Sequence, residues 1–216
     1  MLVRELMNPA PAAARPGMAV PEALSLMREK RVYQMPVVDT LGHLVGVVTE
    51  QDLLHATATS VTSLSVWEIP ALIAHIKVET VMVKDVVCVS EDTAAEEAAR
   101  IMADKGIGCL PVMKGRQMVG FITKSDIFMC LMELLGGMTP GIRIWATTPS
   151  GKGTVARITA AVAAASGNIM GLGYNEVRDG SGSRWHMTLK VQDISREQLL
   201  EALRPVVTEI LDVHED

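Results

Sequence analysis

Aromatic residues are scarce in this chain of 216 residues, at 3%, and cysteine occurs only three times. The 20 basic residues are outnumbered by 25 acidic ones and form no run. This argues against nucleic acid as a partner, because such binding rests on clustered lysine and arginine. No apolar run approaches the roughly 20 residues that span a bilayer, and the first ten residues lack the apolar centre of a signal peptide. We therefore expect a cytoplasmic protein that binds neither nucleic acid nor a membrane.

The residues that usually hold metals or perform catalysis are few and scattered. Cys88, Cys109 and Cys130 lie 21 positions apart, which suits neither a metal site nor a disulfide framework. The histidines, at positions 43, 55, 75, 186 and 214, show no metal-site or catalytic-triad spacing. We expect no metal, no required cofactor and no catalytic residue, and hence a binding protein rather than an enzyme.

One phrase of the sequence occurs twice. Residues 36–52 read PVVDTLGHLVGVVTEQD, and residues 111–126 read PVMKGRQMVGFITKSD. The offset is 75 before the central turn and 74 after it, so one residue is deleted where a deletion is best tolerated. The matched pairs are Met7 and Met82, Ala23 and Ala98, Met27 and Met102, Pro36 and Pro111, Gly46 and Gly120, Thr49 and Thr123, and Asp52 and Asp126. A repeat of this length indicates a duplicated structural unit.

Each repeat predicts the order strand, helix, strand, strand, helix, from apolar periodicity and short β-rich runs. In the first repeat we expect helices over 21–32 and 50–58, and strands over 35–39 and 43–49. In the second we expect helices over 92–106 and 124–135, and strands over 109–113 and 118–123. Asp92 or Thr93 should cap the helix over 92–106, and Gly106 should end it. The apolar segment between the repeats, 61–77, predicts a helical element.

The tail from about residue 141 follows a different pattern, after a boundary marked by Gly136, Gly137 and Pro140. We expect strands over 142–147, 168–177, 184–191 and 206–213, and helices over 154–166 and 195–205 with Ser195 as an N-cap. The order βαββαβ is ferredoxin-like, so the fold class of the whole chain is α/β (α+β). The expected division is 1–60, 61–77, 78–136 and 137–216.

The motifs GVVTEQD and GFITKSD, with the strands MPVVD and LPVM and the leading Met7 and Met82, resemble tandem CBS domains, the intramolecular pairs called Bateman modules. This resemblance covers residues 1–135. The tail, with GKGTVARI and GNIMGLG, resembles an ACT domain, although Pro149–Lys152 stand where that family often has an acidic residue and a proline. The order CBS-CBS-ACT, with SLSVWE between the repeats, is similar to the acetoin-utilisation regulator B-like family.

The resemblance implies clefts that bind an adenosyl ligand (AMP, ADP, ATP, S-adenosylmethionine or NAD). Asp52 and Asp126 would bind ribose hydroxyls, with Thr49 and Thr123 facing the phosphate. The implied apolar walls are Val32, Tyr33, Met35, Pro36, Ile107, Cys109, Leu110 and Pro111, and the implied backbone contacts lie near Ala10, Pro11, Asp85 and Val86. In the tail, the implied effector contacts are Gly151, Gly153 and Asn168. The family also implies a homodimer that regulates a target protein of unknown identity.

Alternatives remain at these positions. Thr-x-x-Asp after a strand is also a capping box, and one motif can serve both roles. Because the second motif contains Lys124 where the first contains Glu50, we hypothesise that the Lys124 site prefers more phosphate charge; otherwise Lys124 is a solvated helix residue. The competing function is an interaction module that dimerises with empty clefts and acts through a protein partner.

Overall fold

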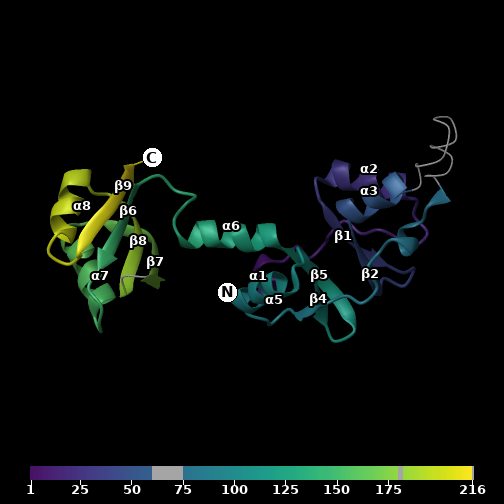
Figure 1. The fold of residues 1–216 in the computed structure, drawn as a ribbon, viewed down its shortest axis with the longest axis horizontal. Coiled ribbons are helices and arrows are strands. Elements are labelled where there is room, and N and C mark those ends of the chain that lie inside the picture. Colours follow the sequence, from purple (N-terminus) through teal and green to yellow (C-terminus); the bar gives the residue numbers. More distant parts are fainter. Residues whose placement is uncertain (60–74, 180–181, 216) are drawn as a thin grey trace. The chain divides into compact units, whose positions relative to one another are not determined.

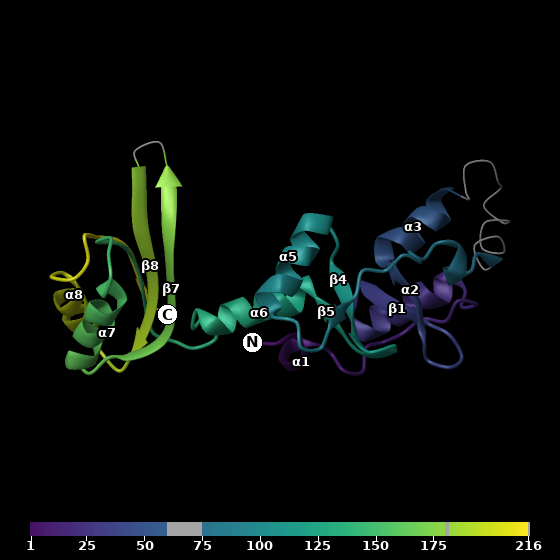
Figure 2. The ribbon, with the colours of Figure 1, turned by 90° about the horizontal axis from the view of Figure 1, so that it is seen from below.

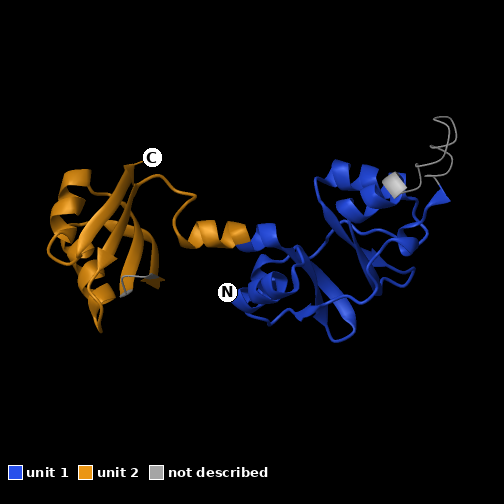
Figure 3. Ribbon diagram, viewed as in Figure 1, with its two compact units in different colours: residues 1–127 blue, residues 128–216 orange. Residues whose placement is uncertain are grey.

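The computed structural model describes residues 1–59, 75–179 and 182–215, which form two compact units, residues 1–127 and 128–216 (Figure 3). Most of the helical segment expected over 61–77 lies outside the described residues. Among the described residues, no helix combines the length and the apolar character needed to cross a membrane.

The first unit contains repeat one and all of repeat two except most of its last helix (Figure 1). Its elements are α1 (Val3–Leu6), α2 (Val20–Lys30), β1 (Gln34–Val38), β2 (Leu44–Thr49), α3 (Glu50–Thr59), the short 3-10 helix η1 (Val78–Thr80), β3 (Val89–Ser90), α5 (Ala95–Lys105), β4 (Cys109–Lys114) and β5 (Gln117–Thr123). Helix α6 (Lys124–Leu134) begins in this unit. Strands β1 and β2 are antiparallel, and β3, β4 and β5 form a second sheet in that order. The expected first strand of repeat one is reduced to a parallel bridge between Ala14 and Val37.

Matched positions of the two repeats are buried to the same degree. Ala23 and Ala98 are fully buried, and Met27 and Met102 are each 1% exposed. They lie on the inner faces of α2 and α5, in two separate cores. The duplication read from the sequence is therefore a duplication of the core, with aliphatic and methionine side chains in place of aromatic ones.

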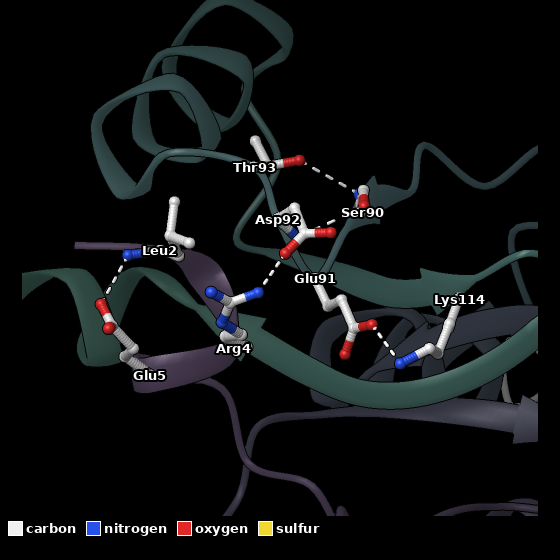
Figure 4. Close-up of polar contacts among 8 residues, drawn as sticks. All are labelled: Leu2, Arg4, Glu5, Ser90, Glu91, Asp92, Thr93 and Lys114. Carbon is white, nitrogen blue, oxygen red and sulfur yellow. Dashed lines mark hydrogen bonds and ion pairs between the residues drawn. The ribbon is translucent and has the colours of Figure 1, made fainter.

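One predicted helix cap is wrong. The N-cap of α5 is Ala94, which has no side chain that could accept a hydrogen bond. Thr93 instead accepts a hydrogen bond from the Ser90 N–H at 3.1 Å, within the turn before the helix. Asp92 forms an ion pair with Arg4 of the N-terminal segment (Figure 4). Gly106 does end the helix, with φ of 66°.

The segment at the start of each repeat contacts the other repeat, and these two segments, residues 1–8 and 76–83, are here called the crossing segments. Residues 1–8 lie along repeat two, where the Val3 N–H donates to Thr93 O at 2.8 Å and Asn8 exchanges backbone hydrogen bonds with Phe121 at 2.9 and 3.0 Å. Residues 76–83 lie along repeat one in the same way, with Val47 and Val83 exchanging backbone bonds at 2.9 Å. Figure 4 shows the ion pair of Arg4 with Asp92, which joins the N-terminal segment to repeat two. Beside it, Glu5 accepts from the Leu2 N–H within the segment, and Glu91 pairs with Lys114 within repeat two. The Arg4–Asp92 ion pair is exposed at both side chains and contributes little to stability, so the backbone bonds and buried side chains hold the segment in place.

The exchange explains why both repeats contain a leading methionine and a glycine in the second strand. Met82 lies against Gly46, where an added Cβ would be 2.7 Å from Met82 Sδ and 2.9 Å from the Val83 oxygen. Met7 lies against Gly120 so closely that an added Cβ would overlap its sulfur. A side chain at either glycine would therefore displace the crossing segment.

The second unit confirms the ferredoxin-like order expected for the tail. Its elements are β6 (Ile142–Thr148), α7 (Thr154–Ala164), β7 (Asn168–Asp179), β8 (Gly182–Gln192), α8 (Arg196–Leu203) and β9 (Glu209–Glu215). The antiparallel sheet has the order β7-β8-β6-β9, and β7 and β8 form a long pair (Figure 2). The two helices bury Ile158, Val162, Leu199 and Leu203 against one face of this sheet. Ser195 caps α8 as predicted, since its hydroxyl accepts from the Gln198 N–H at 3.3 Å.

Candidate functional site

Both Thr-x-x-Asp motifs lie where a strand joins a helix, β2 to α3 and β5 to α6. In the first motif, Asp52 Oδ2 accepts from the Thr49 N–H at 2.9 Å and from the Thr49 hydroxyl at 2.7 Å. In the second, Asp126 Oδ2 accepts the equivalent bonds from Thr123, both at 2.7 Å. Each motif therefore forms a capping box, in which one carboxylate oxygen is occupied and the carboxylate plane is fixed.

The second oxygen of each carboxylate is available. Within the described ranges, Oδ1 of Asp52 and Oδ1 of Asp126 have no hydrogen-bond partner, although both side chains are half-buried. A carboxylate accepts as many as four hydrogen bonds, so capping leaves capacity for a ligand. The two alternatives for this motif, helix cap and ligand contact, are thus geometrically compatible.

A first cleft, here called the Asp126 cleft, has a volume of about 300 Å³. It is lined by parts of residues 8–12, by residues 31–34, by Gly108 and Phe121, and by residues 123–126. It therefore combines the motif of repeat two with the crossing N-terminal segment and the start of β1. Of the residues expected at the site, this cleft brings together Pro11, Val32, Tyr33, Thr123, Lys124 and Asp126.

A second cleft, here called the Asp52 cleft, has a volume of about 510 Å³. It is lined by parts of residues 83–87, by residues 106–109, by Tyr33, Gln34 and Val47, and by residues 49–52. Most of these residues match, in the sequence repeat with its offset of 75 or 74, residues that line the Asp126 cleft. Of the expected residues, this cleft brings together Tyr33, Thr49, Asp52, Asp85, Val86, Ile107 and Cys109.

Four expected wall residues line neither cleft. Met35 and Leu110 are completely buried in the two cores, with 0% of their surface exposed to solvent, and Pro36 and Pro111 are also buried. These residues lie inside β1 and β4, whereas these two strands contribute to the cleft walls only through residues at and just before their starts. Ala10 is likewise absent from the lining of the Asp126 cleft, which takes the neighbouring Pro11 instead.

Several lining residues were not expected from the sequence: Asn8, Arg31, Gln34 and Gly108. Gln34 and Gly108 line both clefts, and the Gln34 amide lies so close to Gly108 that an added Cβ would overlap it. The Gln34 Oε1 atom is buried and has no hydrogen-bond partner among the described residues. The repeat offset of 75 would have identified Gly108 and Gln34, because they are the partners of the expected wall residues Tyr33 and Cys109. It carries no such signal for Arg31, whose partner Gly106 was expected only to end a helix.

Burial keeps the thiol of Cys109, which lines the Asp52 cleft, in its uncharged form. Cys109 is 7% exposed, and burial raises the pKa of its thiol to about 12. A thiol must ionise to act as a nucleophile, so Cys109 is an apolar wall residue at neutral pH.

The three residues expected to contact an effector in the tail are not brought together within one chain. Gly153 is the N-cap of α7 and Gly151 lies in the loop before it, next to the end of β6. Asn168 opens β7 at the other end of the sheet. On β8, Trp185 pairs with Thr148 and Gln192 pairs with Asn168, so the two ends are seven residues apart, about 23 Å.

A sequence model of the family described as CBS domain matches residues 3–59 and 78–133, just over half of the chain. The chain therefore belongs to the CBS-domain family and carries two copies of the domain, as the resemblance of its repeats implied. A CBS domain-containing protein of Dictyostelium discoideum is 29% identical over 143 residues, which make up 65% of this chain and 97% of that protein. Several other curated relatives are longer, and the chain spans less than a third of their length.

Solved structures of CBS pairs are similar to this chain. An acetoin utilization protein (AcuB) from Vibrio cholerae is 30% identical with a TM-score of 0.54, over 62% of this chain and 93% of that one. The CBS domain pair of protein MJ0100, solved in complex with 5'-methylthioadenosine and S-adenosyl-L-methionine, is 25% identical with a TM-score of 0.53, over 64% of this chain and 98% of that one.

Proposed function

We propose that this chain is a regulatory protein that senses adenosyl ligands through its CBS pair and is not itself an enzyme. The candidate ligands are AMP, ADP, ATP, NAD and S-adenosylmethionine, bound in the Asp52 cleft, the Asp126 cleft or both. The proposal rests on the two motif aspartates, each of which lines a cleft, has its carboxylate fixed by the capping bonds of Oδ2 and retains a second oxygen that can accept hydrogen bonds. The ligands bound to the similar MJ0100 pair support the ligand class.

The chemistry of the motif suits the ribose and phosphate of such a ligand. A carboxylate oxygen accepts hydrogen bonds from vicinal hydroxyls, and a bond to a charged group contributes about 1.5–3 kcal/mol. The N-termini of α3 and α6 lie beside the motifs, and unpaired helix N–H groups favour a phosphate there. Val32 in one cleft and Ile107 in the other provide apolar surface for adenine.

For the second unit, we propose an ACT-like domain that supplies homodimer contacts or binds a second small-molecule effector. Its ferredoxin-like sheet ends in β7 and β9, whose outer edges have no strand partner within the described ranges. Open edges favour pairing with another chain. The proposed division remains repeat one in 1–60, a connecting segment in 61–77, repeat two in 78–136 and the ACT-like domain in 137–216.

We also propose a cytoplasmic location and a role similar to that of acetoin-utilisation regulators. None of the three cysteines, Cys88, Cys109 and Cys130, forms a disulfide with another described residue, as suits a reducing compartment. The likeness to the Vibrio cholerae protein supports the second point.

A thermal-shift measurement on the full chain tests the ligand proposal. At 100 times its dissociation constant, a ligand stabilises the fold by about 2.7 kcal/mol, which raises the melting temperature by several degrees. The matched variant is Asp52→Asn with Asp126→Asn, because asparagine retains one oxygen for the cap but loses the charge that binds ribose. We expect adenosyl compounds to stabilise the native chain and not this variant, while the two unliganded proteins melt within a few degrees of each other.

Two results would contradict the proposal. If no adenosyl compound raises the melting temperature at millimolar concentration, the motifs only cap helices, and the competing interaction module with empty clefts is correct. If the double variant responds as strongly as the native chain, the ligand binds elsewhere than at the two aspartates.

A further inference from the structure

The two clefts have opposite charge. In the Asp126 cleft the charged lining residues are Arg31, Lys124 and Asp126, so the cleft is net positive before a ligand enters. In the Asp52 cleft they are Glu50, Asp52 and Asp85, and none of the described residues that line it is basic. Because the clefts are built from matched segments of the two repeats, these differences arise at equivalent places in each site.

The contrast appears at three separate positions of the repeat. Lys124 follows the motif threonine in one cleft, and Glu50 follows it in the other. Arg31 ends the first helix of repeat one, where Gly106 ends that of repeat two. Asp85 lines the Asp52 cleft two residues after the crossing segment 76–83, and its partner at an offset of 75 is uncharged Ala10. Within the described ranges, none of these charged side chains forms an ion pair with another residue, so their charge is directed to solvent or to a ligand.

The backbone at Arg31 is strained, unlike that at its glycine partner. Arg31 has φ of 54° and ψ of 44°, in the left-handed region that a residue with a Cβ adopts at a free-energy cost. Gly106 has a similar φ of 66° without that cost. Strained residues of this kind concentrate at ligand sites, because the structure retains them for contacts that a relaxed residue would not supply. Arg31 is the C-cap of α2, where glycine would have no such cost, and its guanidinium adds a cation to the lining of the Asp126 cleft.

We propose that the two clefts take different classes of adenosyl ligand: the Asp126 cleft binds phosphorylated adenosine, and the Asp52 cleft binds an uncharged or cationic adenosyl thioether or sulfonium. This inference rests on the proposed function and assigns a ligand class to each cleft. Arg31 and Lys124 attract phosphate, which the three carboxylates of the Asp52 cleft repel. Those carboxylates in turn attract a sulfonium or ammonium group. One chain would then respond to two adenosyl compounds at once.

The expected size of the discrimination follows from Coulomb's law. A unit charge a few ångströms from a ligand charge changes affinity about 5-fold in bulk water, and more where the cleft is partly desolvated. The clefts differ at several such positions. We therefore expect each cleft to prefer its own ligand class by about 10-fold or more.

Calorimetric titration of the full chain with AMP and with S-adenosylmethionine tests the assignment. Asp52→Asn leaves the Asp126 cleft intact, and in this variant AMP should bind at least about 10-fold more tightly than S-adenosylmethionine. Asp126→Asn leaves the Asp52 cleft intact, and there the preference should be reversed. Adding Lys124→Glu to the first variant should weaken AMP about 10-fold, and adding Glu50→Lys to the second should weaken S-adenosylmethionine by a similar factor.

The matched controls make the same charge changes on exposed residues that line neither cleft. Lys105→Glu repeats the change at Lys124, and Glu22→Lys repeats the change at Glu50; neither should alter an affinity more than about 2-fold, since solvent and salt screen distant charges. If both ligands bind each single-cleft variant with the same preference, or if the charge reversals act no more strongly than these controls, the charge assignment is wrong while the proposed function stands. If neither ligand binds the native chain, the proposed function fails and this assignment fails with it.

Discussion

Replacement of Gly120 by alanine should displace the N-terminal segment from repeat two. The new Cβ would overlap the sulfur of Met7 and lie 3.1 Å from the Asn8 oxygen. The methionine can move, but Asn8 is held to Phe121 by two backbone hydrogen bonds. Overpacking of this kind costs about 1–3 kcal/mol, and the loss of unfolded-state freedom on Gly→Ala offsets roughly 0.4–1 kcal/mol of it. The net loss should be about 1–2 kcal/mol, or about 4 °C in melting temperature for a chain of this size.

Thermal unfolding followed by circular dichroism, without ligand, measures this effect. Gly17→Ala is the control, because a Cβ at Gly17 has nothing within 4 Å and should leave the melting temperature unchanged or slightly raised. In a Met7→Ala background Gly120→Ala should cost less, because the sulfur that it meets is gone, and the two changes should couple by more than about 0.5 kcal/mol. Equal melting temperatures for Gly120→Ala and Gly17→Ala, or strict additivity with Met7→Ala, would refute the reasoning.

Three further outcomes follow from the structure. Met27→Ala and Met102→Ala should each cost about 2–5 kcal/mol in denaturant unfolding, since both side chains are 1% exposed; a large cost for only one would show that the two cores are not equivalent. Ser195→Ala should cost about 1 kcal/mol through loss of the α8 cap, and Thr93→Ala should cost less because Ala94 is the N-cap of α5; the reverse order would contradict the cap assignment. Iodoacetamide should alkylate exposed Cys88 before Cys109, as peptide mass spectrometry would show. The alkylation rate of Cys109 should still rise with pH toward its pKa of about 12, and rapid labelling of Cys109 at pH 8 would mean that it is not buried.

Local signals in the sequence were sufficient for most helices and strands. The apolar spacing of Ala23 and Met27, and of Ala98 and Met102, identified the inner faces of α2 and α5 because helical periodicity is a local property. The cap at Ser195 was predictable since Gln198 stands three residues later and completes a capping box. At α5 the same logic selected Asp92 or Thr93, but the helix begins later, and the turn uses both side chains for other bonds.

The clefts were less predictable because they depend on contacts between distant segments. The motif residues Thr49, Asp52, Thr123 and Asp126 repeat and therefore stood out. The crossing of residues 1–8 and 76–83 between the repeats has no local signature, so Asn8 was missed. The walls were expected inside the strands, at Met35 and Leu110, yet strand interiors fill the cores here, and the residues at the strand starts face the clefts.

The decisive measurement is a crystal structure of the full chain grown with AMP and S-adenosylmethionine together. We expect an adenosyl ligand in a cleft, with ribose hydroxyls about 2.7 Å from Oδ1 of Asp52 or Asp126 while Oδ2 retains its capping bonds to threonine. We also expect the phosphate beside Arg31 and Lys124. Clefts that stay empty at saturating ligand, or a ligand whose ribose contacts neither aspartate, would show that the two motifs do not bind adenosyl ligands.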